Sequence, residues 1–173
     1  MPGSGDYSFG KENPSRNFDR ILAEHGAAIA RVAAIYGRTS ADRDDLSQEI
    51  TVALWQAWPN FRGDCSERTF VFRVAHNRAV SYLAKARNHG RLSGEEASER
   101  PDPESDLVRE ERAEALMKAV RRLPMVYRQV VSLVLEGLDY AEVAEVLGIS
   151  ENNVAVRMNR GRQMLREALE AYK

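Results

Sequence analysis

Cysteine and histidine are scarce in this chain of 173 residues, which has one cysteine, Cys65, and three histidines. A single cysteine excludes an internal disulfide, and no His/Cys cluster has zinc-site spacing, so neither a metal site nor a cofactor is expected. No apolar run approaches the roughly 18 residues of a membrane span, and the opening MPGSGDYSFGKENPSRN lacks the apolar stretch of a signal peptide. These absences predict a cytoplasmic protein.

Strand signals are missing as well. Neither β alternation nor a Gly-rich strand-turn-helix pattern occurs, whereas apolar residues recur at spacings of three and four along most of the chain. With 43% hydrophobic residues, the composition is that of a globular protein. The sequence therefore predicts an all-α fold.

Charge is unevenly distributed, although the formal net charge is only -1. Residues 93–111 carry eight acidic residues, two arginines and two prolines, whereas residues 60–92 carry seven lysines or arginines against two acids. The acidic stretch has no apolar periodicity, which is typical of a linker. We predict a disordered leader (1–15), a helical domain (16–92), an acidic flexible linker (93–111) and a second helical domain (112–173).

The second domain contains a helix-turn-helix pattern. In EGLDYAEVAEVLG, Ala141, Ala144 and Leu147 share one face of a helix that Gly148 ends with a left-handed turn. Ser150 is a good N-cap for the next helix. That helix has an inward stripe of Val154, Met158, Gly161 and Leu165. This order of elements predicts a DNA-binding helix-turn-helix.

The opposite face of the last helix is rich in amides and arginines. Its centre holds Asn152, Val156, Asn159 and Gln163, and its flanks hold Asn153, Arg157, Arg160, Arg162 and Arg166. Amides can bond adenine bidentately, valine can pack on a thymine methyl, and arginines can hold phosphates. A solvated polar face is the alternative interpretation. The preceding helix and turn favour DNA reading.

In the first domain, DRDDLSQEITVALWQAWP predicts an acidic helix that ends at Pro59. Its inner side holds Leu46, Ile50, Ala53, Leu54 and Ala57, and its outer side holds Asp44, Gln48, Thr51 or Val52, and Trp55. An outward tryptophan among acids indicates a docking patch. Two alternatives stay open. In the first, a neighbouring helix such as HGAAIARVAAIYG would cover Trp55. In the second, the carboxylates of Asp42, Asp44, Asp45 and Glu49 would form a nuclease metal site, although only some of them share a face.

The next helix lies within FRGDCSERTFVFRVAHNRAVSYLAKAR. Its inner stripe is predicted to be Val71, Ala75, Ala79, Tyr82 and Ala86, and its outer side Phe70, Arg73, Asn77, Ser81 and Lys85. Aromatic, cationic and amide groups together suit single-stranded DNA, where bases stack on rings and phosphates meet arginines. The alternative is a plain basic helix with Phe70 partly buried. We expect His76 at the surface, without a catalytic role.

Together these segments resemble one known family. DRDDLSQEITVALWQAW, FRGDCSERTFVFRVAHNRAVSYL, the acidic linker, LPMVYRQVVSLVLEGLDYAEVAEVLGIS and VRMNRGR follow one another as in extracytoplasmic function (ECF) sigma factors of the sigma-70 family. The resemblance covers about Phe18 to Leu169. It implies a non-catalytic initiation factor that binds core RNA polymerase and directs promoter recognition and opening.

The resemblance also implies roles for particular residues. The helix with Asp44, Asp45, Gln48, Glu49 and Trp55 would dock on the beta-prime coiled coil, and the second domain on the beta flap. The loop with Phe61 and Arg62, together with Phe70, Arg73, Asn77, Ser81 and Lys85, would bind the minus-10 element. Asn152, Asn153, Val156, Arg157, Asn159, Arg160 and Arg162 would read the minus-35 element. A separate anti-sigma protein is the expected regulator.

Two other classes of protein remain as rivals. A helix-turn-helix repressor or activator would bind duplex DNA alone, usually as a dimer on a palindrome. A nuclease would cleave DNA with magnesium held by the acidic helix. Copurification with core polymerase distinguishes the first rival from a sigma factor, and metal-dependent cleavage would indicate the second.

Overall fold

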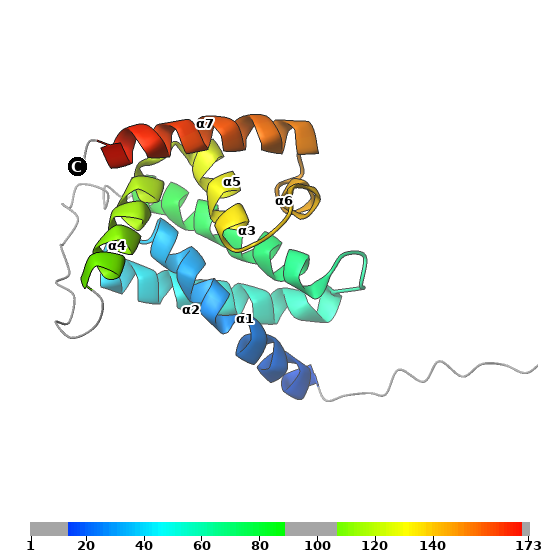
Figure 1. The fold of residues 1–173 in the computed structure, drawn as a ribbon. Coiled ribbons are helices and arrows are strands. Elements are labelled where there is room, and N and C mark those ends of the chain that lie inside the picture. Colours follow the sequence, from blue (N-terminus) through cyan, green and yellow to red (C-terminus); the bar gives the residue numbers. More distant parts are fainter. Residues whose placement is uncertain (1–13, 89–106, 171–173) are drawn as a thin grey trace, which may run out of the picture.

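The computed structural model describes residues 14–88 and 107–170, and every regular element within these ranges is a helix. The first range forms α1 (Pro14–Tyr36), α2 (Ser40–Ala57), the short 3-10 helix η1 (Trp58–Asn60) and α3 (Glu67–Asn88). The second forms α4 (Leu107–Arg122), α5 (Met125–Leu135), α6 (Tyr140–Leu147) and α7 (Glu151–Glu170) (Figure 1). The all-α prediction is confirmed.

The acidic helix α2 begins at a capping box. The Asp42 backbone N–H donates to the Thr39 hydroxyl, and the Thr39 backbone N–H donates to the Asp42 carboxylate, both at 3.1 Å. Three predicted inner residues, Leu46, Ile50 and Leu54, are buried. Pro59 lies in η1, directly after the helix ends. The cap and the buried stripe fix which side of α2 faces solvent.

The predicted helix-turn-helix is present as α6, a turn and α7. Gly148 has φ of 64° and ends α6 in the left-handed region, as the sequence predicts. The Ser150 hydroxyl then accepts a 3.3 Å hydrogen bond from the Asn153 backbone N–H, which confirms it as the cap of α7.

The predicted inner face of α6 is wrong at one residue. Ala141 is exposed, whereas Val143, Ala144 and Val146 are buried and Leu147 is half-buried. The larger valines take the inward positions because they remove more apolar surface from water than Ala141 would. The helix is therefore rotated relative to the prediction, and its acidic side reaches the first half of the chain.

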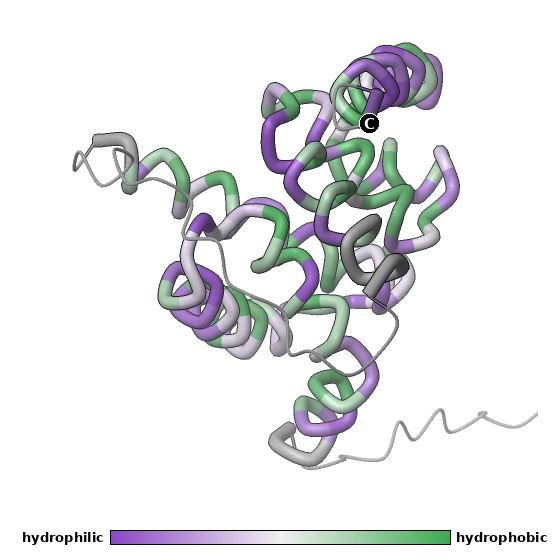
Figure 2. Tube along the Cα trace, turned by 60° about the vertical axis from the view of Figure 1, so that its left-hand side comes forward, coloured by the Kyte–Doolittle hydropathy of each residue, from purple (hydrophilic) through white to green (hydrophobic). Residues whose placement is uncertain are grey.

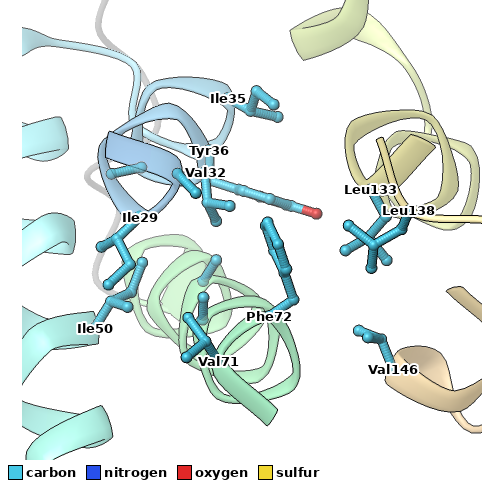
Figure 3. Packing of buried hydrophobic residues seen from close by; sticks show 14 of the residues in the cluster. Ile29, Val32, Ile35, Tyr36, Ile50, Val71, Phe72, Leu133, Leu138 and Val146 are labelled. Carbon is cyan, nitrogen blue, oxygen red and sulfur yellow. The ribbon is translucent and has the colours of Figure 1, made fainter. Parts of the chain in front are cut away.

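The two helical units pack against each other. α3 lies against α6, and α1 lies against α4. Figure 3 shows the Tyr36 side chain pointing toward Leu133 and Leu138 of the second unit, with Phe72 beside Tyr36 and Val146 of α6 facing the same space. These side chains belong to one continuous cluster of buried apolar residues. The two units predicted from the sequence thus share a core.

The boundaries differ slightly from those predicted. α1 already begins at Pro14, inside the predicted leader, and residues 107–111 of the predicted linker belong to α4. The predicted leader up to residue 13, and residues 89–106 with most of the linker, lie outside the described residues.

Candidate polymerase and nucleic-acid interfaces

The predicted reading face of α7 is open to solvent. We call it the α7 outer face, and its exposed members are Asn152, Asn153, Val156, Asn159, Arg160 and Arg162. Arg157 is half-buried, and its Nε donates a 2.8 Å hydrogen bond to the Asn153 side chain. Val156 is 47% exposed, so its apolar side chain is available to a partner. The structure therefore brings all seven predicted residues onto one accessible helix.

The inner side of α7 is held tightly in place. Val154, Met158 and Gly161 are buried as predicted, and Leu165 is half-buried. A Cβ atom at Gly161 would lie 2.7 Å from Cγ2 of Val131, so only glycine allows this approach to α5. The outer face consequently has a fixed orientation, with α7 along one edge of the molecule (Figure 1).

The α7 outer face is also basic. Residues 152–166 include four arginines and no aspartate or glutamate. Figure 2 shows α7, beside the C label, largely in hydrophilic colours. A solvated helix face normally mixes both signs of charge, so this composition favours a negatively charged partner such as DNA.

The α2 outer face combines acids with apolar side chains. Asp44, Asp45, Gln48, Val52 and Trp55 are exposed, and the exposed fraction of Trp55 is 60%. The alternative in which a neighbouring helix covers Trp55 is therefore wrong. Packing of α1 onto the opposite, buried side of α2 leaves the tryptophan outside. A large exposed aromatic among acids is typical of a protein-docking surface.

A pocket of about 410 Å³ opens between α2 and α3 beside this face. It is lined by Asp45, Gln48, Glu49, Val52, Ala53, Gln56, Arg78 and Tyr82. Glu49 forms a 2.7 Å ion pair with Arg78 across the pocket. Burial and the nearby carboxylate of Asp42 raise the pKa of Tyr82 to about 12, so its hydroxyl stays protonated. The pocket offers acceptors to a basic or amide side chain of a partner.

The carboxylates of the alternative nuclease site do not gather around a common point. Asp42 closes the α2 capping box and accepts a 3.1 Å hydrogen bond from the Tyr82 hydroxyl. Burial alone would raise the pKa of Asp42, but the hydrogen bonds from Thr39 and Tyr82 outweigh it and hold the pKa below its ordinary value. Among the described residues, no three His, Cys, Asp or Glu side chains are placed to hold a metal ion.

The predicted stacking residues form an aromatic cluster. Phe61 stacks on Trp58 with ring centroids 5.0 Å apart, and Phe70 lies 4.9 Å from Phe61 and 5.9 Å from Trp58. Phe61 and Phe70 are half-buried, while Arg62 in the following loop is exposed. Phe70 therefore supports the loop from within instead of presenting a free ring, as the alternative interpretation held. Trp58, which the sequence analysis did not assign to the site, is the base of the cluster.

The remaining predicted residues on α3 divide into two groups. Asn77, Ser81 and Lys85 are exposed, and the Ser81 hydroxyl donates to the Asn77 carbonyl at 2.9 Å. Arg73 is half-buried, and its guanidinium contacts Glu145 of α6. The structure thus keeps the C-terminal part of this face open and pairs its N-terminal part with the other half of the chain.

The expectation of a surface histidine is wrong, because His76 is 1% exposed. Its Nδ1 lies 3.0 Å from the Tyr36 hydroxyl, which also hydrogen-bonds the Ser132 side chain of α5. Burial lowers the pKa of His76 to about 3 and raises that of Tyr36. Sequence reasoning missed this Tyr36–His76–Ser132 contact because it joins residues far apart in the chain.

Comparison with known protein families gives a match for each half of the chain. Residues 21–89 match the family described as Sigma-70 region 2, and residues 113–165 match Sigma-70, region 4. Within the described ranges, no helix is long and apolar enough to cross a membrane.

Individual relatives match almost the whole chain. RNA polymerase sigma factor CnrH of Cupriavidus metallidurans is 31% identical over 168 residues, covering 90% of this chain and 88% of its own length. ECF RNA polymerase sigma-E factor of Escherichia coli is 28% identical over 170 residues, with 90% and 87% coverage. The solved structure of CnrH in complex with the cytosolic domain of CnrY has a TM-score of 0.68 at 28% identity, covering 92% of this chain and 91% of that one.

The fold and the two matched regions define a non-catalytic specificity subunit, a transcription initiation factor that binds core RNA polymerase and promoter DNA. The chain belongs to the sigma-70 family of RNA polymerase sigma factors, in its ECF group.

Proposed function

We propose that three separate surfaces of this sigma factor make the three contacts needed for initiation, with core polymerase, the minus-35 element and the minus-10 element. The α2 outer face docks on the beta-prime coiled coil of core polymerase through Asp44, Asp45, Gln48 and Trp55, with Glu49 contributing from the adjoining pocket. The exposed Trp55 supports this role most strongly. Its apolar ring is unfavourably hydrated in the free chain, and a partner that buries it would gain binding free energy. The acidic pocket beside it suits a basic partner helix.

The α7 outer face reads the minus-35 element in the major groove. Asn152, Asn159 and Val156 are central enough to reach base edges, while Arg160 and Arg162 flank them and suit phosphates. The absence of acids from residues 152–166 is the observation that supports this role. The second half also contacts the beta flap of polymerase.

The exposed part of α3 and the preceding loop bind the minus-10 element. Asn77 presents an amide that suits the pairing edge of an extruded base, with exposed Ser81 and Lys85 further along the helix and Arg62 in the preceding loop. The Trp58–Phe61–Phe70 cluster gives the loop a rigid base. Because initiation takes place on chromosomal DNA, the site of action is the cytoplasm.

A separate anti-sigma protein regulates this chain. The similarity to CnrH, whose solved structure contains the cytosolic domain of CnrY, supports this assignment. The exposed apolar residues Val126 and Leu135 of α5 are available to such a partner.

In vitro transcription tests the proposal directly. Purified chain and core polymerase are incubated with a library of genomic fragments, and transcripts are sequenced. We expect a small set of promoters that share two separated elements and that the chain alone does not transcribe. Transcripts identical to those of core polymerase alone would reject the function.

A further inference from the structure

Two neighbouring asparagines at the start of α7 differ in what binds their side chains. Oδ1 of Asn153 accepts a 2.8 Å hydrogen bond from Nε of Arg157, one turn further along the helix. The Asn152 side chain is exposed and makes no hydrogen bond or ion pair within the part of the chain that the structure describes. One amide is therefore engaged by the protein itself, whereas the other is available to a ligand.

The contact with Arg157 fixes how the Asn153 amide is turned. The guanidinium Nε is only a donor, so the amide must direct its carbonyl oxygen, and not its NH2 group, toward it. The Asn153 backbone is held as well, because its N–H donates to the Ser150 hydroxyl at 3.3 Å. An asparagine that reads adenine turns both its oxygen and its NH2 group to the base. An oxygen held by Arg157 disfavours that role for Asn153.

The same contact leaves the outer end of the Arg157 guanidinium open. Arginine has five N–H donors, and only the one on Nε is used here. Over residues 14–88 and 107–170, neither Nη atom of Arg157 has a hydrogen bond or an ion pair. No aspartate or glutamate occurs from residue 152 to residue 166, so this stretch of α7 offers no competing carboxylate. The fork of Nη1 and Nη2 is thus oriented by Asn153 and available to an outside acceptor.

The place of Arg157 on α7 indicates which acceptor it meets. An α-helix with its side chains is about 10 to 12 Å across, and the major groove of B-DNA is about 12 Å wide. A helix that fills the groove turns the centre of its outer face to the base edges and its flanks to the two phosphate walls. Asn152 and Val156 are exposed near the centre, whereas Arg157 is half-buried at the flank. The fork of Arg157 therefore faces a wall, where two phosphate oxygens match its two Nη groups.

We propose that Asn153 is a positioning residue of the minus-35 interface, which holds the Arg157 guanidinium in place to bind one phosphate of the DNA backbone. The inference rests on the proposed role of α7 and deepens it by giving the two asparagines different tasks. Asn152 contacts base edges and contributes to sequence preference. Asn153 touches no DNA and contributes affinity that is the same for every promoter, because a side chain that is already ordered loses less freedom on binding.

Binding of the holoenzyme, assembled from the full chain and core polymerase, to promoters with a randomised minus-35 element tests this division. Asn153→Ala should weaken binding about threefold to tenfold, the effect of leaving one long side chain unordered, without changing the order of preferred sequences. Asn152→Ala is the matched control, since it removes the same amide one residue earlier and should relax preference at one position. The cap of α7 is kept in Asn153→Ala because Ser150 binds the backbone of this residue.

A double-variant experiment tests whether Asn153 acts through Arg157. Arg157→Ala should weaken all promoters and reduce the salt slope by about 1, as expected for the loss of one phosphate contact. In that background, Asn153→Ala should cause no further loss, since it has no guanidinium left to hold. The free energy of unfolding of each variant, from chemical denaturation, is compared with that of wild type. A merely structural role would lower stability and would weaken binding equally with and without Arg157.

Three results would overturn the positioning role while leaving the DNA-binding role of α7 in place. They are a changed base preference in Asn153→Ala, additive losses of affinity in the double variant, and unchanged affinity in Asn153→Ala when Arg157→Ala binds weakly. Failure of the proposed function gives a different pattern. If α7 does not contact the minus-35 element, then Asn152→Ala, Arg157→Ala and Asn153→Ala all bind and rank promoters as wild type does.

Discussion

Helices α3 and α7 are both basic and carry amides on their outer sides, yet they differ in what lies against them. The α7 outer face has no other part of the described chain packed over it, and Asn152, Val156 and Asn159 are exposed. On α3, Arg73 is paired with Glu145 and Phe70 is packed in an aromatic cluster. The difference teaches that a helix pattern indicates which residues face outward, but not whether another unit of the same chain covers them.

The largest expected effect concerns the buried histidine of α3, for which α7 has no counterpart. The unfolded pKa of histidine is about 6.5, whereas burial lowers the folded pKa of His76 to about 3. Below pH 6.5 the unfolded state binds a proton that the folded state does not, so stability falls as the pH falls toward 3. The loss reaches roughly 3 kcal/mol by pH 4.5.

Chemical denaturation at several pH values measures this effect. His76→Asn keeps a polar group near the Tyr36 hydroxyl but does not titrate, so its stability should fall less steeply between pH 6.5 and 4.5. Parallel pH profiles for wild type and His76→Asn would show that the histidine is not responsible.

The second prediction concerns the open part of α3. Asn77→Ala should leave core binding nearly intact but reduce promoter opening about tenfold to a hundredfold, or roughly 1.4 to 2.7 kcal/mol. The physical reason is that unstacking a base must be offset by contacts made only to the extruded nucleotide. Permanganate footprinting on duplex promoter DNA measures opening.

A template already mismatched at minus-10 is the control for this variant. It should restore part of the lost activity, because the unstacking cost is removed from the reaction. Equal opening by wild type and Asn77→Ala on the duplex would exclude Asn77 from the mechanism.

The third prediction contrasts these DNA surfaces with the α2 outer face. Trp55→Ala and Asp44→Lys should each weaken core polymerase binding by about 1 to 2 kcal/mol without unfolding the chain. Asp19→Lys, the same charge change at an exposed position of α1, serves as the control. Undiminished pull-down of core polymerase by both α2 variants would reject the docking surface.

The smallest expected effects lie on α7 and distinguish base reading from phosphate contact. Asn159→Ala should relax sequence preference by about 1 kcal/mol at one or two minus-35 positions. Arg160→Ala should weaken all promoters and reduce the salt slope by about 1. Selection from randomised promoters measures both variants, and the reverse outcome would make Arg160 the base reader.

Local patterns were sufficient for much of the fold and for the exposure of the α7 outer face. The capping residue Ser150, the left-handed Gly148 and the buried stripe of α7 act within a few residues of one another, so the sequence indicates them directly. The exposure of the α7 outer face follows from that stripe. Trp55 was undecided between cover and exposure until the position of α1 was known.

Tertiary structure alone decided the contact between the halves. Helical periodicity placed Arg73 on an outer face, and we expected His76 at the surface, but Arg73 is paired with Glu145 of α6 and His76 is buried beside Tyr36. By itself the sequence determined the helices, the turn before α7 and the separation of charge. Which arginines meet Glu136 and Glu145 depends on the long-range packing of α3 against α6, and no local pattern specifies pairs more than sixty residues apart.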